Sequence, residues 1–185
     1  MDFQYQDDGE RFKRAAERGV GDFKLSFNQD KTHLIEFGCF AKSNREQRGI
    51  GKPRSFDFIG FTHIYSIRRD NGKFKLMCES IKKKRRDKIK QLSKTLMQYR
   101  HKPLWKLGSW LRKVLTGYYN YFAIPGNHTS LQMMRAGVAQ GWIKALRRQS
   151  QKGSNFNWFK IQRWVNQFSP HTRVRPPYPN QRFHL

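Results

Sequence analysis

The chain has 185 residues, of which 37% are hydrophobic and 15% aromatic, so it is long and apolar enough to bury a core. Its 38 Lys and Arg outnumber its 13 Asp and Glu, and the resulting net charge of +25 indicates a polyanionic partner, nucleic acid before an anionic membrane. The acidic N-terminus and the lack of any run of about 18 apolar residues argue against a secretory signal and a membrane-spanning helix, so we expect a cytoplasmic protein without a membrane partner.

The acidic residues are unevenly distributed. Residues 1–30 carry seven acids against five bases, whereas residues 88–185 contain no Asp or Glu and 18 Lys and Arg. The second half therefore has no side-chain carboxylate to act as a general acid or base or to hold a hard metal ion. Cys39 and Cys78 lack paired metal-ligand spacing, and the six His form no close pair. We expect no metal site and no cofactor in this chain.

The first 55 residues predict one short helix and two strands. The helix is expected over Glu10–Arg18, capped by Asp7 or Asp8 and ending at Gly19 or Gly21. Alternation of apolar and polar residues predicts a strand around Leu25 and Phe27 and a second over His33–Ala41. A polar, basic loop is expected over Lys42–Arg54.

A further strand and a hairpin follow. The strand is expected over Ser55–Phe61, with Phe56 and Phe58 inward and with Gly60 permitting close approach of another backbone. Asn71-Gly72, between the apolar runs 63–67 and 73–78, is a strong hairpin signal because both central residues of the favoured turn need positive φ.

From Ile81 onward the apolar residues recur with the helical period of 3.6, which predicts four helices. The residues expected to face inward are Ile89, Leu92, Leu96 and Tyr99 in the first; Leu107, Trp110, Leu111, Val114, Leu115, Tyr118 and Phe122 in the second; Leu131, Met134, Val138, Trp142 and Leu146 in the third, which runs from about Leu131 to Arg148; and Trp158 or Phe159, Ile161, Trp164 and Val165 in the fourth. The expected fold class is α+β: a piece of short helix and antiparallel strands (1–80), a helical piece (81–168) and a Pro/Arg-rich tail (169–185).

The strongest candidate site is the basic segment 81–102, in which Asp87 is the only acid. A solvated helix face normally mixes both signs of charge, so nine net positive charges in 22 residues favour phosphate binding over a plain charged surface. The candidate phosphate-binding residues of this segment are Lys82, Lys83, Lys84, Arg85, Arg86, Lys88, Lys90, Lys94, Arg100 and Lys102.

Other cations and aromatics add secondary candidates. Arg112 and Lys113 lie on the second helix, and Arg147, Arg148 and Lys152 end the third, where they either complement the helix dipole or bind phosphate; both interpretations stay open. The aromatics that could stack on bases are Trp105, Trp110, Tyr118, Tyr119 and Tyr121. Their spacing assigns most of them to the core, with Tyr119 as the expected exception.

Tyr5-Gln6-Asp7-Asp8 matches the Tyr-x-Asp-Asp signature of reverse transcriptases, whose paired carboxylates at a hairpin tip hold two divalent ions. That motif needs apolar strands on both sides, whereas Gly9-Glu10-Arg11 follows here and opens a helix. We therefore favour a helix-capping role for Asp7 and Asp8 over a catalytic one.

Several stretches together resemble the C-terminal part of a bacterial group II intron reverse transcriptase/maturase. Residues 27–38 (FNQDKTHLIEFG) and 56–63 (FDFIGFTH) are similar to the late palm motifs, with Lys31 and Gly60 as the matching motif residues. Residues 110–127, with Gly117-Tyr118-Tyr119-Asn120-Tyr121-Phe122, resemble the centre of maturase domain X, the thumb. Trp142, the 147–151 cluster, and Pro176-Pro177-Tyr178-Pro179 with Arg182-Phe183 resemble the closing segments. Gln149 and Arg175 depart from the pattern, which tends to have Arg and His at these positions.

The resemblance implies a palm remnant followed by a helical thumb, in a chain that starts just past the catalytic carboxylates, as in a truncated intron-encoded protein. It implies binding of group II intron RNA to assist splicing, with DNA as a further partner, and no catalytic residue in this chain; Mg²⁺ is expected only for the intact parent enzyme. Two alternatives stay open. One is a fragment of an RNA-directed DNA polymerase that is active only with a separate palm and fingers piece. The other is a generic basic nucleic-acid-binding protein.

Overall fold

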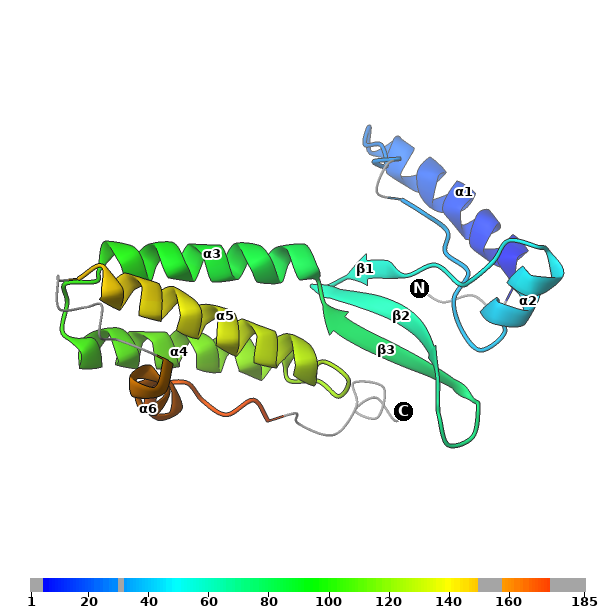
Figure 1. The fold of residues 1–185 in the computed structure, drawn as a ribbon. Helices are drawn as coiled ribbons and strands as arrows, with labels where there is room; N and C mark the ends of the chain where they lie inside the picture. The colour runs from blue at the N-terminus through cyan, green and yellow to red at the C-terminus, as the bar shows by residue number, and fades with distance from the viewer. Residues whose placement is uncertain (1–4, 30–31, 150–157, 174–185) are drawn as a thin grey trace. The chain divides into compact units, whose positions relative to one another are not determined.

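The computed structural model describes residues 5–29, 32–149 and 158–173 (Figure 1). In chain order its elements are α1 (Gln6–Asp22), α2 (Ala41–Gln47), β1 (Phe56–Phe58), β2 (Phe61–Ile67), β3 (Phe74–Ser80), α3 (Lys82–Gln98), α4 (Leu104–Phe122), α5 (His128–Arg147) and α6 (Trp158–Phe168). The strands form one antiparallel sheet with β2 between β1 and β3. The expected α+β class is confirmed, and most of the C-terminal half is helical.

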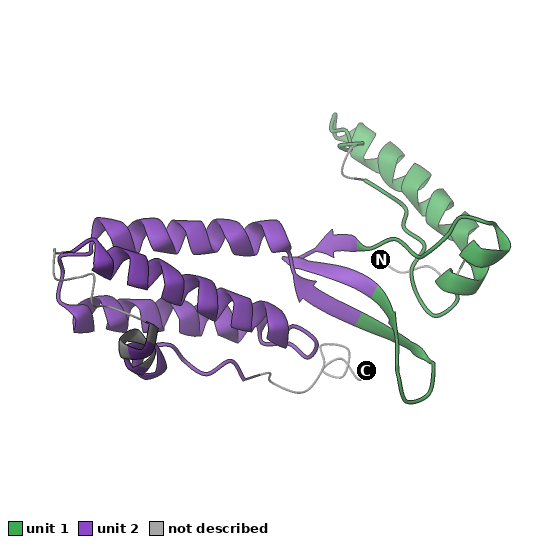
Figure 2. Ribbon diagram, viewed as in Figure 1, with its two compact units in different colours: residues 1–55, 65–76 green, residues 56–64, 77–185 purple. Residues whose placement is uncertain are grey.

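The chain packs as two compact units (Figure 2). The first comprises Met1–Ser55 and Tyr65–Leu76, and the second comprises Phe56–Ile64 and Met77–Leu185. Strands β2 and β3 each contribute residues to both units. The division at residues 80 and 168 into palm remnant, thumb and tail stays a prediction.

In the first unit, α1 is longer than expected. It begins at Gln6, so Asp7 and Asp8 lie in its first turn, and no side chain caps it. The capping role predicted for them is therefore wrong, although their charges do complement the helix dipole. The helix also continues through both expected glycine stops and ends where Lys24 adopts φ +58; the N–H groups of Lys24 and Leu25 then donate to the carbonyls of Gly21 and Val20.

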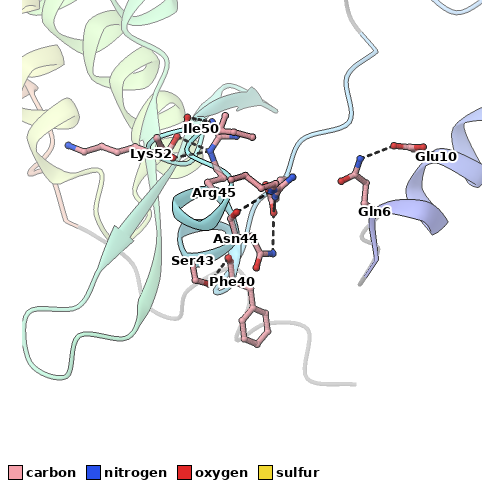
Figure 3. Close-up of polar contacts among 11 residues, drawn as sticks. Gln6, Glu10, Phe40, Ser43, Asn44, Arg45, Ile50 and Lys52 are labelled. Atoms are coloured by element: carbon pink, nitrogen blue, oxygen red, sulfur yellow. Dashed lines mark hydrogen bonds and ion pairs between the residues drawn. The ribbon is translucent and has the colours of Figure 1, made fainter.

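The segment between α1 and β1 differs from its predicted structure. No strand occurs in the described residues 25–29 and 32–41, and α2 occupies part of the expected basic loop. Leu25 is 66% exposed, so within the described residues the expected apolar side of this segment is not buried at that position. Figure 3 shows what orders the loop after α2: the Arg45 guanidinium donates to the carbonyl oxygens of Ile50 at 2.9 Å, Lys52 at 3.1 Å and Gly51 at 3.2 Å.

The segment Ser55–Phe61, predicted as a single strand, instead contains β1, a two-residue turn and the start of β2, which together form a hairpin. Phe58 pairs with Phe61, and the turn residues Ile59 and Gly60 both have positive φ, 45° and 84°. This is the geometry of the tight turn that suits antiparallel strands, yet a β-branched residue adopts it only at a cost. Phe56 is half-buried as expected, but Phe58 is 58% exposed, so its predicted inward position is wrong.

The Ile81 backbone does approach Gly60 within the second unit, but what favours glycine at this position is its positive φ of 84° and not a lack of space for a side chain. The Gly60 carbonyl accepts a 3.2 Å hydrogen bond from the Ile81 N–H, and a Cβ at Gly60 would lie 3.6–3.7 Å from the rings of Tyr121 and Phe122. The Tyr121 hydroxyl donates to the Ile59 carbonyl at 2.7 Å. The β1–β2 turn is thereby held against the end of α4.

The hairpin signal at Asn71-Gly72 is also confirmed, with a longer loop than expected. The Arg68 N–H donates to the Lys73 carbonyl at 2.8 Å, and the Gly72 N–H donates to the Arg68 carbonyl at 3.0 Å. Among the loop residues only Gly72, at φ +66, has a positive φ, so the expected turn with two such residues does not form here.

The core of the second unit is built by α3 to α6. All five residues predicted to face inward on α5 are buried, as are Leu92 and Leu96 on α3. On α4 the most buried positions are Leu107, Leu111, Leu115 and Tyr119, whereas Trp110, Val114, Tyr118 and Phe122 pack at the margin of the core. Tyr99, predicted inward, is 40% exposed. The helical half was therefore predicted correctly in outline, with the centre of the α4 stripe shifted.

Candidate nucleic-acid interface

Helix α3 separates an apolar face from a basic face. Leu92 and Leu96 are buried and Ile89 is partly buried against the core, which anchors one side of the helix. The basic side chains on its remaining surface are exposed: Lys82, Lys83, Lys84, Arg86, Lys90 and Lys94. The predicted basic face thus extends along α3 from Lys82 to Lys94, with Asp87 as the one exposed carboxylate of the helix.

The first turn of α3 has the wrong sign of charge for a helix N-terminus. Lys82, Lys83 and Lys84 lie there with no acidic residue and no side-chain cap. The positive end of the helix dipole disfavours each cation by about 0.3–1 kcal/mol at low salt. An anion at this end would interact favourably both with the lysines and with the unpaired N–H groups of the first turn.

Arg85 was predicted to bind phosphate with the other cations of the basic segment, and this prediction is wrong. It is only 8% exposed, and its Nη1 donates a 2.8 Å hydrogen bond to the Ser130 hydroxyl of α5. Its Nη2 also approaches the Met133 sulfur at 3.4 Å. The guanidinium therefore joins α3 to α5 instead of facing solvent.

The other cations of the segment have local partners. The Lys88 ammonium, on a half-buried residue, donates to Gln91 Oε1 at 3.2 Å, and the Arg100 guanidinium donates to the Met97 carbonyl at 3.1 Å. The Lys102 ammonium lies 4.2 Å from the centre of the Tyr99 ring. Lys102 thus stays exposed, whereas the side chains of Lys88 and Arg100 already use some of their hydrogen-bond donors within the protein.

Helix α4 supplies Arg112 and Lys113, both exposed as expected. The prediction that Tyr119 lies outside the core is wrong. Tyr119 is 5% exposed, and burial raises the pKa of its phenol. Base stacking on Tyr119 is therefore excluded by its position. The spacing from Leu111 through Leu115 to Tyr119 is the helical i, i+4 series that marks it as core.

Two exposed aromatics near the α3–α4 connection are better stacking candidates. Trp105 is 60% exposed, and the Lys106 ammonium lies 5.4 Å from its ring centre. Tyr99 is 40% exposed and has the Lys102 ammonium over its ring, although its helical spacing predicted a position in the core. An exposed ring next to a cation suits an unpaired base beside its phosphate.

At the end of α5, Arg147 and Arg148 are exposed, while Lys152 lies outside the described residues. Arg148 shares a shallow surface groove of about 410 Å³ with residues of α3 and α5; its lining is Ser93, Lys94, Met97, Gly137, Gln140, Gly141, Lys144 and Arg148. Lys144 and Gln140 were missed from the sequence, although they stand four and eight residues before Arg148 and so share its helix face.

Of the two palm-motif residues, Gly60 lies in the β1–β2 turn described above, and Lys31 lies outside the described residues. Within the described part of the chain, no group of three or more His, Cys, Asp or Glu side chains is arranged to hold a metal ion. None of the helices in that part is long and apolar enough to cross a membrane.

Comparison of the chain with protein-family models, with curated proteins and with solved structures finds no match. The resemblance to group II intron maturases therefore rests on the sequence motifs alone and is carried forward as a proposal.

Proposed function

We propose that this chain is an RNA-binding module of the maturase type, which binds folded group II intron RNA and assists its splicing. The observation that carries the proposal is the basic face of α3, above all the three exposed lysines in its first turn. These lysines destabilise the isolated helix, because their positive charges lie at the positive end of its dipole. Such an unfavourable arrangement is typical of a functional site, where a bound ligand supplies the compensating charge. A phosphate backbone supplies the matching charge.

The composition of the helical half supports RNA as the partner. Residues 88–185 contain no acid, so no side chain of that segment can neutralise its 18 cations, and a polyanion is the natural counterion. Exposed Trp105 and Tyr99 beside lysines add stacking surfaces, which suits unpaired RNA bases. Domain X of the maturase family, which residues 110–127 resemble, has the same binding role.

We infer further that this chain alone does not polymerise DNA, because Asp7 and Asp8 belong to the first turn of α1 instead of a hairpin tip. Primer extension on an RNA template, with and without Mg²⁺, tests this. Activity above a mock preparation that disappears in the Asp7→Asn/Asp8→Asn variant would assign the enzyme function to this chain. A separate palm and fingers piece stays a proposed partner.

The binding experiment compares folded group II intron RNA with random RNA duplex and random DNA duplex in a filter assay at increasing salt. The proposal predicts steep salt dependence and a retained preference for the folded intron. Equal affinity for all three probes at every salt concentration would instead support a generic basic nucleic-acid-binding protein.

The charge of the first turn of α3 can be tested in the same assay. Replacing Lys82, Lys83 and Lys84 by Gln is expected to weaken binding of intron RNA and to lower the salt slope by about 0.7–0.9 for each phosphate that the variant no longer neutralises. The helix itself should become slightly more stable, since three unfavourable charges leave its N-terminus. Weaker binding together with a higher melting temperature would separate a direct effect on RNA binding from a defect in folding.

A further inference from the structure

Helices α3 and α5 run in the same general direction and are in contact (Figure 1). Arg85 contacts Ser130, Ile89 lies against Gly137, and Ser93 lies against Gly141, so contacts advance along both helices in the same direction. A Cβ at Gly137 would stand 2.8 Å from Ile89 Cδ1, and one at Gly141 would stand 2.3 Å from Ser93 Oγ. The two glycines therefore permit the close approach of α3.

A shallow groove lies beside this contact on the surface of the helix pair. Gly137 and Gly141 contribute no side chain to the groove of about 410 Å³ described above. The groove is also lined by the exposed residues Lys94 of α3, Gln140 and Lys144 of α5, and Arg148 directly after α5. Cations and an amide thus surround one concave surface, whose lining also includes Ser93 and Met97 of α3.

The charge at this groove exceeds what helix stability requires. Parallel helices bring their C-terminal ends to the same side, and each end carries a partial charge of roughly −0.5, together about −1. Lys94, Lys144 and Arg148 supply three positive charges, and residues 88–185 contain no Asp or Glu to balance them. A net positive charge of about two remains after the dipoles are compensated, so capping alone does not account for the cluster.

We propose that the α3–α5 groove binds a backbone phosphate of folded RNA, with Lys94, Lys144 and Arg148 providing charge and Gln140 and Ser93 providing hydrogen-bond donors. The inference rests on the RNA-binding function proposed above and assigns it a second contact. Lys94 follows Lys82 by 12 residues, about 18 Å along the helix axis, so the groove and the first turn of α3 contact separate phosphates. The resulting footprint follows α3 along its length.

The test measures the dissociation constant of the full chain for a labelled, folded group II intron transcript. The triple variant Lys94→Gln/Lys144→Gln/Arg148→Gln removes the groove charges. The matched control, Arg68→Gln/Arg69→Gln/Lys73→Gln, removes three exposed cations from the β2–β3 loop. We expect the groove variant to bind about tenfold or more weakly and with a salt slope smaller by about 0.7–0.9, the change for one phosphate, whereas the control loses about threefold or less through its net charge alone.

A second variant, Gln140→Trp, fills the groove without changing its charge. It is expected to weaken RNA binding at least fivefold while circular dichroism and melting temperature stay close to those of the unmodified chain. Equal losses in the two triple variants, or unchanged binding by Gln140→Trp, would overturn the groove assignment. If the unmodified chain shows no preference for folded intron RNA over random duplex, the proposed function itself fails, so the two failures are distinguishable.

Discussion

The side-chain oxygen of Asn127 accepts a 2.9 Å hydrogen bond from the backbone N–H of Ser80, a residue 47 positions earlier in the chain. The amide nitrogen of the same side chain donates to the Phe122 carbonyl at 2.9 Å, and Asn127 is fully buried. One side chain thus connects the end of β3, the end of α4 and the start of α5. This junction determines how the strand pair is attached to the helical core within the second unit.

Replacing Asn127 by Ala is expected to lower the free energy of unfolding by about 1–3 kcal/mol, because the buried Ser80 N–H loses its partner, whereas the Phe122 carbonyl keeps the hydrogen bond from the Ile124 N–H. Urea denaturation followed by circular dichroism measures this. Asn120→Ala, on the exposed side of α4, is the matched control and should change stability by less than about 0.5 kcal/mol. Equal effects would show that the junction does not depend on the Asn127 amide.

The neighbours Arg85 and Arg86 should have opposite roles. Arg86→Gln, at an exposed position, is expected to weaken RNA binding and to lower the salt slope by up to about 0.9 with little change in stability. Arg85→Gln removes the donor to Ser130 and is expected to destabilise the fold by about 1–3 kcal/mol while leaving the salt slope unchanged.

Filter binding across a salt series and thermal unfolding, carried out on both variants, check this pair. A lower salt slope in Arg85→Gln, with unchanged stability, would return Arg85 to the set of phosphate ligands.

Arg85 and Tyr119 illustrate what the sequence could and could not predict. In a run of five consecutive cations each residue resembles the next, yet Arg85 precedes Ile89, Leu92 and Leu96 at helical spacing and so belongs to the apolar face. Tyr119 follows Leu111 and Leu115 in the same way. The helical spacing indicated that both residues are buried, but the prediction gave more weight to the charge of Arg85 and the aromatic character of Tyr119.

The helices α3 to α5 were predictable because dense apolar residues at period 3.6 persist over several turns, where local pattern and tertiary burial agree. The segment between α1 and β1 was not, because a short alternating run becomes a strand only if another strand pairs with it. The close contact between α3 and α5 depends on Gly137 and Gly141 facing Ile89 and Ser93. That pairing is tertiary and leaves no local signal.

The Tyr119 phenol makes a pH-dependent contribution to stability. Burial raises its pKa above the ordinary value of 10.0, an effect that the Ser169 hydroxyl and the Arg135 charge partly offset. A raised folded-state pKa means that the unfolded chain loses the proton first, so this contribution is complete below about pH 10 and is lost as the pH rises further. Tyr119→Phe removes the titrating group.

We therefore expect Tyr119→Phe to melt near the unmodified chain at pH 7 and above it at alkaline pH. Melting temperatures of both proteins between pH 7 and 11 provide the measurement. The two curves should diverge only above about pH 10, and parallel curves over the whole range would contradict a buried, proton-retaining phenol.

Two glycines of α4 should respond in opposite directions to the same substitution. At Gly108 a Cβ would stand 2.5 Å from Phe168 Cγ, whereas at Gly117 nothing lies within 4 Å. Phe168 packs in turn against Trp164 and Trp142, with ring centres 6.0 and 6.3 Å apart, so its ring has little room to move aside. Gly108→Ala is expected to destabilise by about 1–3 kcal/mol through overpacking.

Gly117→Ala should instead stabilise by up to about 1 kcal/mol, because it gains helix propensity at an open position. Tryptophan fluorescence during urea unfolding measures both variants and also reports on Trp164 and Trp142 around Phe168. The contrast separates packing against α6 from the intrinsic cost of glycine in a helix. If Gly108→Ala were as stabilising as Gly117→Ala, α6 would not pack on α4 through Phe168.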